Sequence, residues 1–187
     1  ANFGVGYDGI DLVRCAERGI VVTNTPDVLT EEVADTALGL LLNTVRELSA
    51  AERYLRAGRW ERDGAFPLTK ATMRDRTVGI AGLGRIGLAI ARRLDAMGVP
   101  VVYYTRTEKP GIPYRYFGDL KTMAEAVDTL IAVLPGTPET RGIIGADVFH
   151  ALGREGIFIN IGRGITVDDA ALIEALRTRS IRAAGLD

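Results

Sequence analysis

The chain has 187 residues, 47% hydrophobic and 25% charged, which is enough apolar surface for one full-sized core and part of a second. Its 23 basic and 24 acidic residues are mixed along the chain and give a net charge of -1, so no basic field attracts nucleic acid or anionic lipid. No stretch has the apolar length of a membrane span and the single cysteine suits a reducing compartment, so we expect a cytoplasmic protein without nucleic-acid or membrane partners.

The first 25 residues indicate a remnant of a larger domain. A glycine-rich loop leads into a short helix over 11–18 and an apolar strand over 20–22, and these elements look cut from something larger. We therefore expect two parts, a remnant over 1–25 and a full domain over 26–187.

A long helix is predicted next. It begins at Thr30, and apolar positions at helical spacing carry it to residue 57, before Gly58. This length is unusual in a globular domain and suggests an element that spans a domain boundary or an oligomer interface. Residues 61–73 are expected to form a loop.

From residue 77 onward, strand-like apolar runs alternate with helix-like ones. Strands are predicted at 77–82, 100–104, 129–134 and 156–161, with a further apolar segment at 181–186, and helices at 85–97, 120–126, 146–152 and 168–176. This alternation is typical of parallel strands joined by crossover helices. The prediction is an α/β fold, a doubly wound parallel sheet of the Rossmann type that binds a nucleotide.

A glycine-rich turn with the sequence GLGRIG follows the first of these strands. In it, Gly82 permits a tight turn, Gly84 lets the backbone approach a pyrophosphate, and Gly87 lets helix and strand pack closely. The helix that starts at Arg85 and Ile86 offers free N–H groups to the phosphates. Because the turn lies between a strand and a helix, dinucleotide binding is favoured over a glycine turn without a ligand.

The end of the next strand indicates which dinucleotide binds. An NAD site usually places a carboxylate there to accept the ribose hydroxyls, but this chain has Thr105, Arg106 and Thr107. A guanidinium beside two hydroxyls suits a 2′-phosphate, so NADP(H) is the preferred cofactor. NAD(H) stays possible, with Glu108 serving the ribose and Arg106 solvated.

Several segments resemble the D-isomer-specific 2-hydroxyacid dehydrogenases. The family signature is matched by FINIGRGITVDDAALIEAL over 158–176, and LPGTPETRG, GLGRIG, PDVLTEEVADTALGLLL and AAGLD are similar to the family elsewhere. The resemblance therefore covers nearly the whole chain. Within the family, the arginine after the strand and the LPGTPETR stretch look most like glyoxylate and hydroxypyruvate reductases that use NADPH.

The resemblance implies roles for individual residues. Arg163 matches the catalytic arginine, which binds the substrate carboxylate and polarises the keto oxygen. Small residues of the loop over 3–8 match the family's substrate loop, with Val5 and Gly6 at the binding positions. The implied cofactor contacts include Ile161 and Gly162 before the arginine, Val133, Leu134 and Pro135 beside the nicotinamide, and Asp187 at its carboxamide. No metal is expected.

The resemblance also implies that residues 1–25 belong to a flavodoxin-like substrate domain, and that the helix from Thr30 pairs with its copy in a homodimer. The family's catalytic glutamate and histidine fall beyond this chain, and His150, its only histidine, is read as a helix residue without a catalytic role. We expect a fragment of an enzyme that reduces glyoxylate or hydroxypyruvate to the D-2-hydroxy acid. The alternatives are a dinucleotide-sensing, corepressor-like module and an NAD-dependent relative acting on phosphoglycerate or formate.

Overall fold

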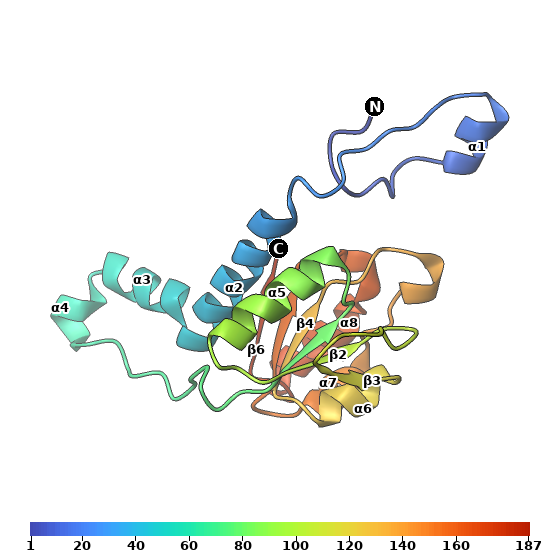
Figure 1. The fold of residues 1–187 in the computed structure, drawn as a ribbon. Coiled ribbons are helices and arrows are strands. Elements are labelled where there is room, and N and C mark those ends of the chain that lie inside the picture. Colours follow the sequence, from blue (N-terminus) through green and yellow to red (C-terminus); the bar gives the residue numbers. More distant parts are fainter.

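The computed structural model describes residues 1–187, and six parallel strands form its central sheet (Figure 1). In chain order they are β1 (Val78–Ala81), β2 (Val101–Tyr104), β3 (Arg115–Phe117), β4 (Thr129–Ala132), β5 (Ile157–Asn160) and β6 (Ala183–Leu186). Their spatial order is β3-β2-β1-β4-β5-β6. This is the strand order of the doubly wound dinucleotide-binding fold, so the predicted fold class is confirmed.

Helices cover both faces of the sheet and divide the apolar core in two. One face carries α2 (Thr30–Arg46) and α5 (Arg85–Ala96), and the other carries α6 (Leu120–Glu125), α7 (Ala146–Leu152) and α8 (Asp169–Arg177). Successive residues of one strand serve opposite faces, since Leu130 packs toward α6 and α7 while Ile131 packs toward α2 and α5. Burial on both faces explains the unbroken apolar runs of β1, β4 and β5.

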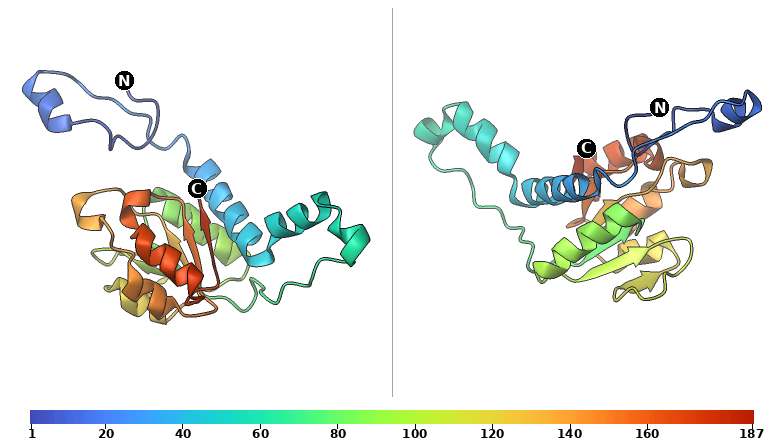
Figure 2. Two further views of the ribbon diagram at one scale, coloured as in Figure 1. Left: turned by 180° about the vertical axis from the view of Figure 1, so that it is seen from behind. Right: turned by 45° about the horizontal axis from the view of Figure 1, so that its top comes forward.

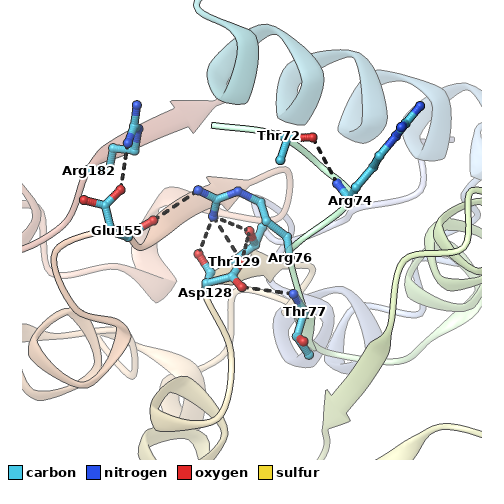
Figure 3. A network of polar contacts seen from close by, with 8 residues as sticks. All are labelled: Thr72, Arg74, Arg76, Thr77, Asp128, Thr129, Glu155 and Arg182. Carbon is cyan, nitrogen blue, oxygen red and sulfur yellow. Dashed lines mark hydrogen bonds and ion pairs between the residues drawn. The ribbon is translucent and has the colours of Figure 1, made fainter. Parts of the chain in front are cut away.

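The amino ends of three strands are tied together by a buried guanidinium (Figure 3). Arg76 is only 7% exposed, and its Nη1 donates to the carbonyl of Asp128 at 2.9 Å and to Asp128 Oδ1 and Thr129 Oγ1 at 3.1 Å. Its Nη2 donates to the carbonyl of Glu155 at 3.3 Å. A single side chain, that of Arg76 before β1, thus bonds to the starts of β4 and β5.

The long helix predicted from Thr30 is broken. Helix α2 ends at Arg46, Glu47 adopts a left-handed conformation with φ of 55°, and α3 (Leu48–Arg56) leaves in a new direction. Helix α2 begins at Thr30 as predicted, after Leu29, which provides no side-chain hydrogen bond as the amino-terminal cap. A short helix, α4 (Arg59–Asp63), extends into the first residues of the region predicted as a loop, 61–73.

Two segments project from opposite ends of α2 (Figures 1 and 2). One is an arm formed by α3, α4 and the chain up to residue 72. The other is residues 1–25, which contain α1 (Leu12–Glu17), a helix with no buried residue. Residues 20–22 form no strand, contrary to the prediction, because Ile20 and Val21 are exposed and no neighbouring strand pairs with them. No helix in this structure combines the length and apolar character needed to cross a bilayer.

Candidate dinucleotide and substrate site

A cavity of about 400 Å³ opens where β1, β2 and β4 end at their carboxyl edges. Between β1 and β4 the chain order of the sheet reverses, and in such sheets ligands bind outside the carboxyl ends at that point. The lining comprises Gly82, Leu83 and Gly84 after β1, Tyr104, Thr105, Arg106, Thr107 and Lys109 at and after β2, and Val133, Leu134, Pro135, Thr137, Glu139, Thr140 and Ile143 after β4. The structure therefore brings together the predicted residues of three separate sequence segments.

The three glycines of the turn meet different surroundings. Gly82 has φ of +99°, and a Cβ there would lie 2.7 Å from the carbonyl oxygen of Val133. A Cβ on Gly87 would overlap the carbonyl oxygen of Gly82, whereas one on Gly84 would meet no atom within 4 Å. Packing thus requires the first and third glycines, while the second leaves open space above the start of α5. The turn fits a pyrophosphate, because α5 begins without a side-chain cap and its first N–H groups face that space.

A smaller cavity of about 170 Å³ lies beside the same turn. It is lined by Val5, Asp27, Thr30, Gly84, Arg85, Ile86, Gly87 and Val133. Arg85 Nε contacts Asp27 Oδ1 at 2.8 Å. Val5 of the amino-terminal segment and Asp27, just before α2, thus lie beside the glycine turn.

Hydrogen bonds organise the loop after β2. Thr105 Oγ1 donates to the carbonyl of Thr107 at 2.7 Å, the Tyr116 hydroxyl donates to the carbonyl of Thr105 at 3.1 Å, and the N–H of Lys109 donates to the Tyr103 hydroxyl at 3.0 Å. Arg106 is exposed and lines the cavity with its side chain unpaired. The loop thus presents a free positive charge beside hydroxyl groups.

Glu139 is a cavity residue that sequence reasoning missed. Hydrogen bonding from Thr137 and from its own backbone N–H, together with the charge of Arg106, holds the pKa of the Glu139 carboxyl below its usual value. The carboxylate is therefore ionised near neutral pH and faces the same space as Arg106. Its position in the LPGTPETRG stretch gave no signal, because the approach to Arg106 depends on two loops that follow different strands.

Arg163 follows β5 and its backbone is held firmly. Its carbonyl accepts from Thr166 Oγ1 at 2.7 Å and from the Thr166 N–H at 3.1 Å, while the N–H of Gly162 donates to Asn160 Oδ1 at 3.0 Å. A Cβ on Gly162 would lie 2.8 Å from the carbonyl oxygen of Leu134, and the Arg163 side chain packs against Gly136. These contacts fix the point from which the arginine leaves the sheet.

The guanidinium of Arg163 contacts the loop over residues 3–8, the amino-terminal loop. Its Nε donates to Asp8 Oδ2 at 2.7 Å, and its Nη1 donates to the carbonyl of Gly162 at 3.3 Å. A Cβ on Gly6 would overlap the Nη2 atom. The structure therefore brings Gly6 and Arg163, two predicted substrate residues 157 positions apart, into direct contact.

Three other predicted or considered residues lie apart from the main cavity. Ile161 is buried after β5. Asp187 lies after β6, where its N–H donates to the carbonyl of Asn160 at 2.9 Å and it faces α2 near Thr36 and Asn43. His150 is exposed on α7.

A parallel sheet of this order, with a glycine turn at its switch point, defines a dinucleotide-binding α/β domain. The family model for the NAD-binding domain of D-isomer specific 2-hydroxyacid dehydrogenases matches residues 38–187. The chain belongs to this family, as its motifs predicted. Binding of a nicotinamide dinucleotide follows from that membership and from the fit of the turn.

Similar proteins include named reductases. A glyoxylate/hydroxypyruvate reductase A, HPR2, from Arabidopsis thaliana is 48% identical over 187 residues, all of this chain and 59% of that protein. A hydroxyphenylpyruvate reductase from Plectranthus scutellarioides is 46% identical over the same share of each chain. An NADPH-dependent glyoxylate/hydroxypyruvate reductase, SmGhrB, from Sinorhizobium meliloti, solved with NADP and malonate, is 63% identical with a TM-score of 0.94, over 98% of this chain and 57% of that one. The chain thus spans about three fifths of the length of these relatives.

Proposed function

We propose that the protein carrying this chain reduces a short 2-keto acid, glyoxylate or hydroxypyruvate, to the D-2-hydroxy acid with NADPH. The observation that carries the proposal is the meeting of Arg163 with the backbone of the amino-terminal loop at the carboxyl edge of the sheet. The reductases named above support it, since they match the chain over its whole length or nearly so. The alternative of a corepressor-like module has no specific contact in its favour.

The loop is suited to bind a carboxylate. The carbonyl of Val5 accepts from Asn24 Nδ2 at 2.9 Å and that of Gly6 accepts from Asn2 Nδ2 at 2.8 Å, whereas the N–H groups of Val5 and Gly6 donate to no acceptor in the chain. With the carbonyls engaged, the free N–H groups form an anion-binding concavity next to the Arg163 guanidinium. We assign the substrate carboxylate to this place.

Chemically, Arg163 supplies permanent positive charge. A guanidinium is charged at all physiological pH values and has several donors in a fixed plane, so it can hold the carboxylate and also polarise the keto oxygen as negative charge develops there. When bound, the dinucleotide supplies the hydride. Val133, Leu134 and Pro135 line the cavity after β4 and would hold the nicotinamide ring against an apolar wall, which Gly162 supports by packing against the Leu134 backbone next to Ile161.

The NADP(H) preference is proposed for Arg106. Thr105, Arg106, Thr107 and Lys109 line one end of the cavity, where two positive charges and the Thr107 hydroxyl suit a 2′-phosphate, while the Thr105 hydroxyl holds the loop by donating to the Thr107 carbonyl. The Sinorhizobium relative, described as NADPH-dependent and solved with NADP, supports this preference.

The first test is a titration of the chain with NADPH and with NADH, followed by nicotinamide fluorescence. We expect tighter binding of NADPH, and expect Arg106→Asp to weaken NADPH by about tenfold or more without weakening NADH, because the 2′-phosphate loses its partner while the new carboxylate can accept from the ribose hydroxyls of NADH. Arg154→Asp is the matched control, since Arg154 is exposed, unpaired and outside the cavity. Equal affinities for the two nucleotides would overturn the preference and favour an NAD-dependent relative.

We also propose a homodimer in which the arm and α2 contact a second copy. Leu48, Leu55, Trp60 and Leu68 are exposed along the arm, and Leu68 retains 95% of its accessible surface. Exposed apolar side chains gathered on one projecting segment mark an interaction surface. Sedimentation velocity should give a dimer that Trp60→Asp converts to monomer, whereas Ile173→Asp, at an equally exposed position on α8, leaves it intact.

Finally, residues 1–25 are proposed to belong to a substrate domain and residues 26–187 to the nucleotide domain. The lack of any buried residue in α1 supports this division, because a helix without a core needs further chain to pack against. We place the protein in the cytoplasm, where Cys15 would remain the free thiol that it is here.

A further inference from the structure

The direct contacts between Arg163 and the amino-terminal loop include an ion pair with Asp8. Nε of Arg163 and Oδ2 of Asp8 are 2.7 Å apart, and these residues are 155 positions apart in the chain. The arginine side chain is 45% exposed and the aspartate side chain 43% exposed. An ion pair this exposed adds little to the stability of a fold, so its main effect is on where the guanidinium points.

Two nitrogens of the Arg163 guanidinium have acceptors within the chain, and Nη2 has none. Asp8 takes the single Nε–H, and the carbonyl of Gly162 accepts from Nη1. Nη2 lies against Gly6, whose missing Cβ provides the room. Nη2 therefore lies beside the loop backbone at Gly6, where the N–H groups of Val5 and Gly6 have no acceptor.

Asp8 itself is placed by a braced loop. Asn2 and Asn24 hold the carbonyls of Gly6 and Val5, and the N–H of Gly4 donates to Thr25 Oγ1 at 3.0 Å. These bonds join residues 2–6 to one another and to residues 24–25. They fix the backbone just before Asp8, and with it the position of the Asp8 carboxylate. An arginine has four rotatable side-chain bonds, so without such a partner its guanidinium would sample many orientations.

We propose that Asp8 is a positioning residue that orients the Arg163 guanidinium toward the substrate carboxylate and keto oxygen. Nothing else in the chain pairs with the Arg163 Nε. This inference rests on the proposed function for its consequence in turnover, but the orientation of Arg163 can be measured without turnover.

The first arm of the test observes Arg163 directly, by ¹H–¹⁵N correlation of arginine Nε–H groups in this chain. The Arg163 resonance is assigned by its disappearance in Arg163→Lys. We expect it to be resolved and slow to exchange with water in the wild type, to move to the solvent-exposed position and exchange rapidly in Asp8→Ala, and to be partly restored in Asp8→Asn. Glu17→Ala is the matched control, because Glu17 is an exposed acid on the same segment without an ion pair.

The second arm is steady-state kinetics of the protein that carries this chain, with glyoxylate and NADPH. Asp8→Ala should raise KM for glyoxylate and lower kcat, together reducing kcat/KM by about tenfold or more, since misalignment of a catalytic group has effects of that size. Asp8→Asn should recover part of the loss, and KM for NADPH should stay unchanged.

An Arg163 resonance identical in wild type and Asp8→Ala would overturn the proposal, as would unchanged glyoxylate kinetics in an active protein. If the wild type reduces no 2-keto acid, the proposed function fails, and the resonance still decides whether Asp8 orients Arg163. Equal weakening of NADPH and glyoxylate would assign Asp8 a structural role and also overturn the proposal.

Discussion

The arginines at the two edges of the sheet differ in burial and in bonding. At the amino edge, the Arg76 guanidinium is buried and bonded to the starts of β4 and β5 (Figure 3). At the carboxyl edge, Arg106 is exposed and has no partner, and the Arg163 side chain is 45% exposed and pairs only with Asp8. A buried charge whose terminal nitrogens are bonded within the protein holds the fold, whereas an exposed charge with free donors is available to a ligand.

The largest effect is expected at the amino edge. Arg76→Ala should lower the free energy of unfolding by about 3 kcal/mol, because it leaves the buried Thr129 hydroxyl oxygen and the Glu155 carbonyl without this donor and removes the ion pair with Asp128. Urea denaturation measures this loss. Arg56→Ala, which removes an exposed pair with Glu52, should cost less than about 1 kcal/mol. Equal losses in the two variants would show that the buried cluster does not stabilise the fold.

The sequence was sufficient to predict most of the sheet. Strands β1, β4 and β5 are buried on both faces, so the physical constraint on them appears directly as uninterrupted apolar residues. Strand β3 was missed because Arg115–Phe117 is only three residues long and includes an exposed arginine. The break at Glu47 was missed because its left-handed conformation is unusual for glutamate and leaves no mark on the apolar spacing.

The candidate site was predictable where all the residues needed for one function lie in a single segment of the sequence. The glycine turn and the loop from Thr105 to Thr107 each carry their chemistry locally, and both line the cavity as expected. Asp8 acquires its role only through its ion pair with Arg163, and Glu139 only through the nearby charge of Arg106, and each arginine lies on a distant loop. Such pairs depend on how the strands are ordered, and composition or periodicity cannot reveal them.

A second prediction separates packing from ligand approach within the glycine turn. Gly87→Ala should destabilise the fold by about 1–3 kcal/mol, because its Cβ would overlap the carbonyl oxygen of Gly82. Gly84→Ala should cost less than about 1 kcal/mol, since its Cβ meets no atom, yet it should weaken NADPH binding by filling the space left for the pyrophosphate. Thermal denaturation and fluorescence titration measure the two quantities. Unchanged NADPH affinity in Gly84→Ala would place the pyrophosphate elsewhere.

The smallest effect concerns Glu139, whose carboxylate opposes a bound 2′-phosphate in the cavity that Arg106 also lines. Glu139→Gln should tighten NADPH binding by about threefold at neutral pH and leave NADH unchanged, because only the phosphate is repelled through a largely aqueous space. The pKa of Glu139 is lowered, so its charge is present at neutral pH and is lost only as the pH falls through that lowered value, where the wild type should come to match the variant. Glu125→Gln, an exposed acid on α6, should change neither affinity. If Glu139→Gln instead weakens NADPH binding, the carboxylate orients Arg106 more than it repels the phosphate. Arg106 would then depend on a partner within the protein, as Arg76 does at the amino edge.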